Sequence, residues 1–150
     1  MNINFQKITK NNIDIVLSLH VKPTQKNFIE TTSQCLNEAN NLDIWRPIAI
    51  CDESNIIGFA MYGLFPDEGA NGRVWLDRFL IDEKYQGKGY GKMVLPLLIS
   101  HIQNEYNCTK IYLSIYENNS VALNIYINIG FKFNGEFDIN GEKVMVLNLL

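Results

Sequence analysis

The sequence has few cysteines, few histidines and no long apolar run. Its three cysteines, Cys35, Cys51 and Cys108, cannot all pair with one another, and none belongs to a Cys-x-x-Cys motif. The two histidines lie far apart, at positions 20 and 101, so no spacing typical of a metal site is present. No apolar stretch approaches the ~20 residues of a membrane-spanning helix, and the alternating start of the chain does not resemble a signal peptide. We therefore expect free thiols in a reducing cytoplasm, no metal and no membrane contact.

The chain also lacks an excess of positive charge. It has 13 Lys and Arg against 16 Asp and Glu, which gives a formal net charge of −3. Nucleic acids and anionic membranes are bound through basic patches that release counterions, so this balance disfavours both as partners. A mildly acidic protein is better suited to a small cationic substrate. Because 150 residues are enough to bury a core, we expect a single globular domain over residues 1–150.

The spacing of apolar residues predicts a mixed α/β domain. Strands are expected at residues 3–8, 47–51, 56–65, 73–82, 110–116, 131–137 and 142–149, and helices at residues 13–20, 25–39, 90–105 and 120–129. His20 falls on the apolar face of the first helix and is expected in the core. The Asn-Gly pair at residues 140–141 is a strong signal for a hairpin between the last two strands. Antiparallel strands that lead into β-α-β units are typical of an α+β-like α/β fold.

One stretch between a predicted strand and a predicted helix contains three alternating glycines: Gln86-Gly87-Lys88-Gly89-Tyr90-Gly91-Lys92. A Walker phosphate loop requires another glycine spacing and a Ser or Thr after the lysine, where this chain has Met93. A dinucleotide fingerprint requires Gly-x-Gly-x-x-Gly and a later acidic residue at a strand end, and both are missing. Two interpretations remain. The stretch is either a flexible turn that caps the helix, or a loop whose backbone N–H groups converge on a diphosphate, with Lys88 and Lys92 adding ionic contacts.

Two motifs resemble those of the GNAT superfamily of N-acetyltransferases. The pattern Gln86-x-x-Gly89-x-Gly91 resembles the acetyl-CoA loop of that family, and the segment from Asn119 to Phe131 resembles its Asn-x-x-Ala-x-x-x-Tyr-x-x-x-Gly-Phe helix. The resemblance implies a GNAT fold, with a mixed, mostly antiparallel sheet of about seven strands, flanking helices and splayed parallel central strands. The stretches AMYGLFPDE, NGRVWLDRFLIDEKYQGKGYG and FNGEFDINGEKVMVL are further similar to bacterial spermine/spermidine acetyltransferases associated with multidrug exporters.

The resemblance implies a cytoplasmic enzyme, and a homodimer, that transfers an acetyl group from acetyl-CoA to a primary amine. It implies that Tyr126 faces the CoA sulfur and donates a proton to the departing thiolate; the alternative is a tyrosine that only packs on the sheet. Asn119 would hold the pantetheine arm, cap the helix, or do both. The implied acetyl-CoA contacts are the strand backbone at Phe79, Leu80 and Ile81 and the loop residues Gln86, Gly87, Lys88, Gly89, Tyr90, Gly91 and Lys92.

Asp77 is the candidate general base, acting through water. Strand alternation would place it on the same face as Trp75 and Phe79, and a carboxylate among aromatic side chains is costly unless it is paired or used. Burial would raise its pKa toward a useful range. The alternative is a buried ion pair with Arg78 or Arg73. A bulge that shifts the strand by one residue would weaken the catalytic interpretation.

A polyamine requires a groove in which carboxylates alternate with aromatic faces. Glu30 on the second predicted helix, Tyr62 and Trp75 are the best candidates for its lining, together with Asp77. The predicted function is therefore acetylation of spermidine or spermine by direct attack in a ternary complex. An acetyltransferase for another small amine and a catalytically inactive acyl-CoA-binding regulatory module are the alternatives.

Overall fold

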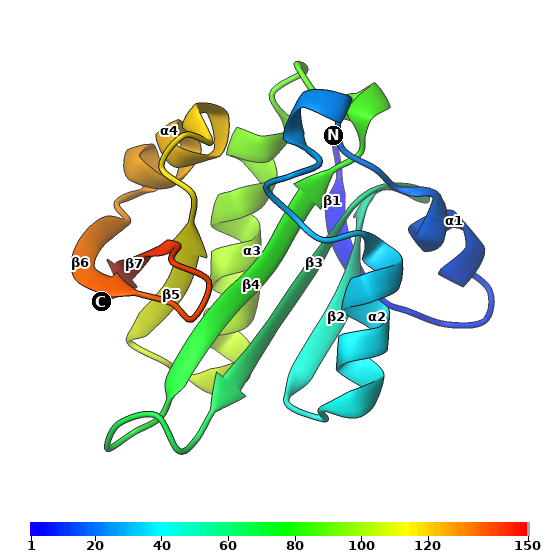
Figure 1. Cartoon of the computed structure of the whole chain (residues 1–150). Helices are drawn as coiled ribbons and strands as arrows, with labels where there is room; N and C mark the ends of the chain where they lie inside the picture. Colours follow the sequence, from blue (N-terminus) through cyan, green and yellow to red (C-terminus); the bar gives the residue numbers. More distant parts are fainter. Residues whose placement is uncertain (150) are drawn as a thin grey trace.

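The computed structural model describes residues 1–149, which form one seven-stranded sheet with helices on both faces (Figure 1). The strands are β1 (Ile3–Lys7), β2 (Trp45–Asp52), β3 (Asn55–Phe65), β4 (Arg73–Ile81), β5 (Lys110–Ile115), β6 (Lys132–Phe137) and β7 (Lys143–Asn148). The helices are α1 (Ile13–Ser18), α2 (Thr32–Asn41), α3 (Tyr90–Tyr106) and α4 (Ser120–Ile129), with 3-10 turns η1 (Pro23–Gln25) and η2 (Glu83–Tyr85). The strand order is β1-β2-β3-β4-β5-β7-β6; β4 and β5 are parallel, and the other neighbouring pairs within residues 1–149 are antiparallel. This arrangement confirms the predicted fold class.

Strand β3 lies at the centre of the core because both of its faces are apolar. Its Phe59 and Met61 belong to a buried cluster with residues of α1 and α2, whereas its Ala60 belongs to the cluster on the α3 face. Figure 1 shows α1 and α2 in front of the sheet and α3 behind it. The buried residues of α3 are Val94, Leu95, Leu98, Ile99 and Ile102. Each such side chain stabilises the fold by roughly 1.5–3 kcal/mol, so the glycine segment leads into a firmly packed helix.

The two parallel strands in the middle of the sheet separate soon after they meet. They share a single register pair, Trp75 with Tyr112, and Figure 1 shows β5 diverging from β4. Beyond that pair, Phe79 and Leu80 remain paired with β3 on one side only. The splayed parallel strands implied by the family resemblance are therefore confirmed, and one edge of β4 keeps backbone groups without a strand partner.

The two N-terminal helices are shorter than predicted. The second begins at Thr32 rather than at residue 25, because Thr31 and Gln34 form a capping box that fixes its start. Glu30 therefore lies in a loop and not on a helix. The first helix ends at Ser18, so the prediction of a core His20 was wrong: its side chain is 66% exposed and its Nε2 lies 3.1 Å from Glu83.

The three cysteines are unpaired, as expected from the sequence. Cys35 and Cys51 are buried, Cys108 is half-buried, and all three are free thiols. None of the helices in residues 1–149 combines the length and the apolar character needed to cross a membrane.

Candidate active site

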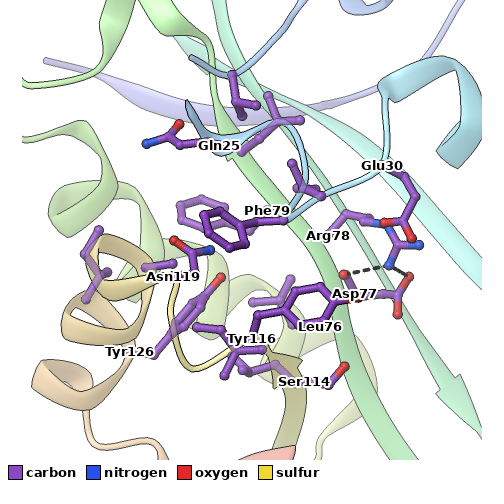
Figure 2. A pocket seen from close by; sticks show the side chains of 18 of the residues that line it. Gln25, Glu30, Leu76, Asp77, Arg78, Phe79, Ser114, Tyr116, Asn119 and Tyr126 are labelled. Carbon is purple, nitrogen blue, oxygen red and sulfur yellow. Dashed lines mark hydrogen bonds and ion pairs between the residues drawn. The ribbon is translucent and has the colours of Figure 1, made fainter. Parts of the chain in front are cut away.

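A cavity of about 860 Å³ opens where β4 and β5 separate. Its walls come from the loop before α2, from β4, the glycine segment, β5, α4 and the turn between β6 and β7. Figure 2 shows Tyr126 and Asn119 on one side of the cavity, and Asp77 with Arg78 and Glu30 on the other. The tertiary structure thus collects nearly all of the predicted site residues in one place. The two predicted residues that do not line the cavity are Tyr62 and Lys88.

The glycine segment forms an open bend before α3. Gly87 and Gly89 have φ of +76° and +85°, and a Cβ at either position would meet no atom within 4 Å. Their glycine identity is therefore required by backbone conformation, while the space beside them stays free. Gly91 differs, because a Cβ there would lie 3.2 Å from the Ile125 side chain of α4. The first N–H groups of α3, which begins at Tyr90, have no partner within the helix, so the bend can bind an anion.

Two side chains of the segment form hydrogen bonds that fix it to the rest of the fold. The Gln86 amide donates to the Ile81 carbonyl at 2.8 Å and to Gln25 Oε1 at 3.0 Å. The Tyr90 hydroxyl donates to Asp52 Oδ2 at 2.7 Å. The Lys88 ammonium lies 5.9 Å from the centre of the Tyr85 ring. The Gln86 of the motif therefore holds the end of β4 and the loop before α2 together.

Tyr126 lies on α4 in the wall of the cavity. Its ring packs edge-on against Phe131, with ring centres 5.6 Å apart, and within residues 1–149 no hydrogen bond to its hydroxyl is found. Burial raises its pKa above the ordinary value of a phenol. The hydroxyl is consequently protonated at neutral pH and is free to interact with a ligand.

Asn119 stands at the N-cap position of α4, but its side chain does not cap the helix. Its backbone carbonyl accepts a hydrogen bond from the Leu123 N–H at 3.0 Å, whereas the side-chain amide makes no capping bond. The amide lies beside Tyr126 in the cavity wall (Figure 2). The capping role weighed from the sequence is therefore limited to the backbone, and the side chain remains available to a ligand.

A bulge in β4 decides which way Asp77 points. Leu76 pairs with Tyr62 and Arg78 pairs with Met61, so Asp77 is an extra residue without a partner on β3. The expected alternation breaks here: Phe79 packs on the α3 face, and the prediction that it shares a face with Asp77 was wrong. The same bulge lets the neighbouring Arg78 form an ion pair with Asp77.

The Asp77 carboxyl is half-buried, and its pKa is raised to about 6. The main cause is burial, which disfavours the charged form. The Arg78 guanidinium opposes this effect, while the negative charges of Glu38, Glu30 and Asp138 add to it. Asp77 therefore forms the ion pair with Arg78 that was weighed from the sequence, and its pKa lies close to neutrality. Its role as a general base stays a prediction.

Tyr62 does not reach the cavity. It is 1% exposed, and its hydroxyl donates to Glu105 Oε1 of α3 at 2.7 Å. The bulge places it opposite Leu76 on the α3 face of the sheet. The structure thus does not support Tyr62 as part of an amine groove.

The other predicted groove residues lie at the cavity together with acidic residues that sequence reasoning missed. Trp75 donates from Nε1 to Glu68 Oε1 at 2.8 Å, and Glu30 pairs with Arg78. The missed residues are Asp138 and Glu142, from the β6–β7 turn. Burial, with a hydrogen bond and the charge of Asp138, raises the pKa of Glu142 to about 7. The Asn-Gly signal predicted this turn, but only the folded chain brings its carboxylates into the same cavity as Asp77.

The acidic residues around the cavity do not form a metal site. Within residues 1–149, no group of three or more His, Cys, Asp or Glu side chains is arranged to hold a metal ion.

The chain matches the model of the acetyltransferase (GNAT) family over residues 13–131. It belongs to the GNAT family. This GNAT protein is 51% identical over 152 residues to the spermine/spermidine N(1)-acetyltransferase of Bacillus subtilis (strain 168), and the match covers 99% of this chain and 100% of that protein.

Solved structures agree on the GNAT fold. A spermidine N-acetyltransferase from Vibrio cholerae, in complex with CoA and spermine, has a TM-score of 0.74 and 19% identity, with 98% of this chain and 95% of that chain covered. An aminoglycoside acetyltransferase in complex with coenzyme A has a TM-score of 0.80 and 18% identity, with the same shares covered. At such low identity these likenesses concern the fold alone.

Proposed function

We propose that this GNAT protein transfers the acetyl group of acetyl-CoA to a primary amine of spermidine or spermine. The observation that carries the proposal is the 51% identity, over the whole length of both chains, to a protein named as a spermine/spermidine N(1)-acetyltransferase. A second relative of the same length, 50% identical, is named as a probable spermine N(1)-acetyltransferase. The acidic side of the cavity supports the same substrate class, since a polyamine carries several positive charges.

The residues at the glycine segment fit the diphosphate of acetyl-CoA. The free space at Gly87 and Gly89 and the unpaired N–H groups at the start of α3 suit an anion that comes close to the backbone. The unpaired edge of β4 at Phe79, Leu80 and Ile81 suits the pantetheine amides, which can bind it as an added strand. Bound acetyl-CoA supplies the activated acetyl group. In this arrangement Lys92 and Asn119 contribute side-chain contacts, whereas Lys88 does not line the cavity.

Asp77 is the proposed base for the amine. An alkylammonium has a pKa of about 10.4, so its deprotonation at pH 7 costs roughly 4–5 kcal/mol at 1.36 kcal/mol for each pKa unit. A carboxylate with a pKa of about 6 is mostly ionised at pH 7 and is a stronger base than an ordinary aspartate. We propose that Asp77 accepts the ammonium proton through a water molecule. It also attracts the cation before that transfer.

Tyr126 is the proposed acid. The thiolate that leaves CoA has a pKa of about 8.5 and departs more easily when it receives a proton. The raised pKa of the Tyr126 phenol keeps it in the protonated form over the working range of pH. Its hydroxyl makes no hydrogen bond to the described residues, so no such bond has to break before the proton is donated. Backbone N–H groups on the unpaired edge of β4 are the donors available to the carbonyl oxygen.

The amine end of the cavity combines aromatic and acidic residues. Trp75 provides an aromatic face, and the carboxylates are those of Glu30, Glu68, Asp77, Asp138 and Glu142. A molecule with ammonium groups separated by methylenes can place one of them at Asp77 and another near the β6–β7 turn. This separation is what would favour a polyamine over a monoamine.

The test is an acetyl-transfer assay with acetyl-CoA and a panel of amines. Spermine, spermidine, propylamine and an aminoglycoside are compared by the release of free CoA thiol, and kcat/KM is measured for each. We expect kcat/KM to be at least tenfold higher for the two polyamines. A preference for the monoamine or the aminoglycoside would assign the protein to another small-amine substrate, and CoA binding without turnover on any amine would indicate a regulatory module.

A further inference from the structure

Arg78 is the most heavily paired charge at the cavity. Its side chain is 13% exposed and meets three carboxylates. Nε lies 2.7 Å from Glu30 in the loop before α2, Nη2 lies 3.4 Å from Glu38 of α2, and Nη1 contacts Asp77 of β4. Nη1 also donates to the Asp77 backbone carbonyl at 3.0 Å. One guanidinium therefore joins three separate parts of the chain, and Figure 2 shows its position between Glu30 and Asp77.

This arrangement depends on the bulge in β4. In a regular strand, two consecutive side chains point to opposite faces of the sheet. Because Asp77 is the extra residue of the bulge, it and Arg78 both reach the face covered by α2. Without the bulge, Arg78 could not contact Asp77 and the α2 carboxylate together.

We propose that Arg78 is a positioning residue for the proposed reaction: its guanidinium holds the Asp77 carboxylate at the cavity and keeps it ionised among the surrounding carboxylates. The inference rests on the proposed function, in which Asp77 is the base. The charged groups that face Asp77 are Arg78, Glu30, Glu38 and Asp138, and Glu142 lies next to Asp138. The negative charges of Glu38, Glu30 and Asp138 favour a proton on Asp77, and Arg78 is the cation that opposes them.

An arginine suits this role better than a lysine. The guanidinium offers five N–H donors in a rigid planar fork, so different nitrogens can serve different carboxylates at fixed angles. A lysine ammonium would supply the charge but not the geometry. The two contributions, charge and orientation, can therefore be separated by comparing two substitutions at the same position.

The experiment compares wild-type protein, Arg78→Lys and Arg78→Gln in two measurements. The first is the pKa of Asp77, followed by 13C NMR of aspartate-labelled protein without substrate and assigned with Asp77→Asn. The second is the pH dependence of kcat/KM for spermidine. We expect Arg78→Gln to raise the Asp77 pKa by one unit or more and to move the acid limb of the profile upward by the same amount. Arg78→Lys should move both by less than half as much, while lowering kcat at every pH.

These measurements distinguish a positioning role of Arg78 from a purely structural one, even if one of the variants fails to fold. An unchanged Asp77 pKa in Arg78→Gln, with a uniform loss of activity at all pH values, would show that Arg78 only stabilises the structure. Thermal unfolding identifies a variant that fails to fold, and in that case the smaller shift expected of Arg78→Lys decides. Wild-type protein that acetylates no polyamine, or an Asp77→Asn profile that matches the wild type, would overturn the proposed function, while the NMR titration would still report the effect of Arg78 on Asp77.

Discussion

The Tyr90 hydroxyl donates a 2.7 Å hydrogen bond to Asp52, which lies 38 positions earlier in the chain. Tyr90 is the first residue of α3 and follows the two positive-φ glycines of the proposed diphosphate site. Asp52 also accepts from the Asn2 backbone N–H at 2.9 Å. The N–H of Asn2 and the hydroxyl of Tyr90 lower the pKa of Asp52. The β2–β3 turn therefore fixes the start of α3 through one side-chain contact.

Tyr90→Phe should weaken CoA binding without slowing the chemical step. The loop would lose its fixed orientation, so we expect the Kd for CoA, measured by calorimetry, to rise about threefold to tenfold. Asp52→Ala should give the same effect, and the double variant should be no worse than either single one. Additive losses would mean that the two residues act separately.

Gly89→Ala should impair CoA binding beyond its effect on stability. An alanine at a φ of +85° costs about 1–2 kcal/mol of unfolding free energy, and its methyl group would enter the free space beside the loop. Gly135→Ala is the matched control, because Gly135 has a φ of +87°, equally free surroundings and no place in the cavity wall. We expect similar losses in chemical denaturation for both variants but a weaker Kd for CoA only in Gly89→Ala. Equal CoA affinity in the two variants would argue against a diphosphate at this bend.

Tyr126→Phe should lower kcat at least tenfold and leave stability unchanged. The lost hydroxyl is the proposed acid. It makes no hydrogen bond within the described structure, so its removal should cost no unfolding free energy. Tyr112→Phe on β5, outside the cavity wall, is the control for tyrosine removal. Steady-state kinetics with saturating acetyl-CoA checks the result. Full activity in Tyr126→Phe would remove the phenol from the mechanism.

The wild-type enzyme should lose kcat/KM for spermidine as the pH falls through about 6. The folded-state pKa of Asp77 is raised from 3.8 to about 6, so the carboxyl is ionised, and can act as a base, above that value and becomes protonated below it. In Asp77→Asn this acid limb should disappear and the remaining rate should fall at least tenfold at pH 8. A limb that persists in the variant would have to come from another group.

Glu142→Gln should reduce the preference for polyamines over monoamines. The pKa of Glu142 is raised to about 7, so its negative charge is present above that pH and is lost below it. We expect the ratio of kcat/KM for spermidine to that for propylamine to rise between pH 6 and 8 in the wild type and to stay flat in the variant. Asp14→Asn, which removes one exposed charge on α1, is the control. A ratio that changes equally in the control would indicate a long-range charge effect.

Local signals in the sequence predicted the elements of the second half of the chain well. Helix α4 has the predicted bounds, because Ser120 follows the Asn119 cap position and Gly130, with a φ of +120°, ends the helix. The first half was predicted less well. The capping box at Thr31 competes with the apolar spacing that begins at residue 25, and the shorter helix prevails. His20 was predicted in the core but is exposed, because the first helix ends at Ser18, before it.

The candidate site also has parts that local sequence signals predicted and parts that they did not. The sequence by itself determined the parts of the candidate site that lie within one short segment each: Gly87 and Gly89 in a bend that leads into a helix, and Tyr126 one turn before the glycine that ends α4. Only the tertiary structure decided the acidic side of the cavity. The bulge in β4 turns Asp77 and Arg78 to one face of the sheet, while Tyr62 is buried on the other face. The turn between β6 and β7 adds its carboxylates to the same cavity. A bulge depends on the register between two strands, and register is set by packing across the whole sheet, which no local pattern of residues encodes.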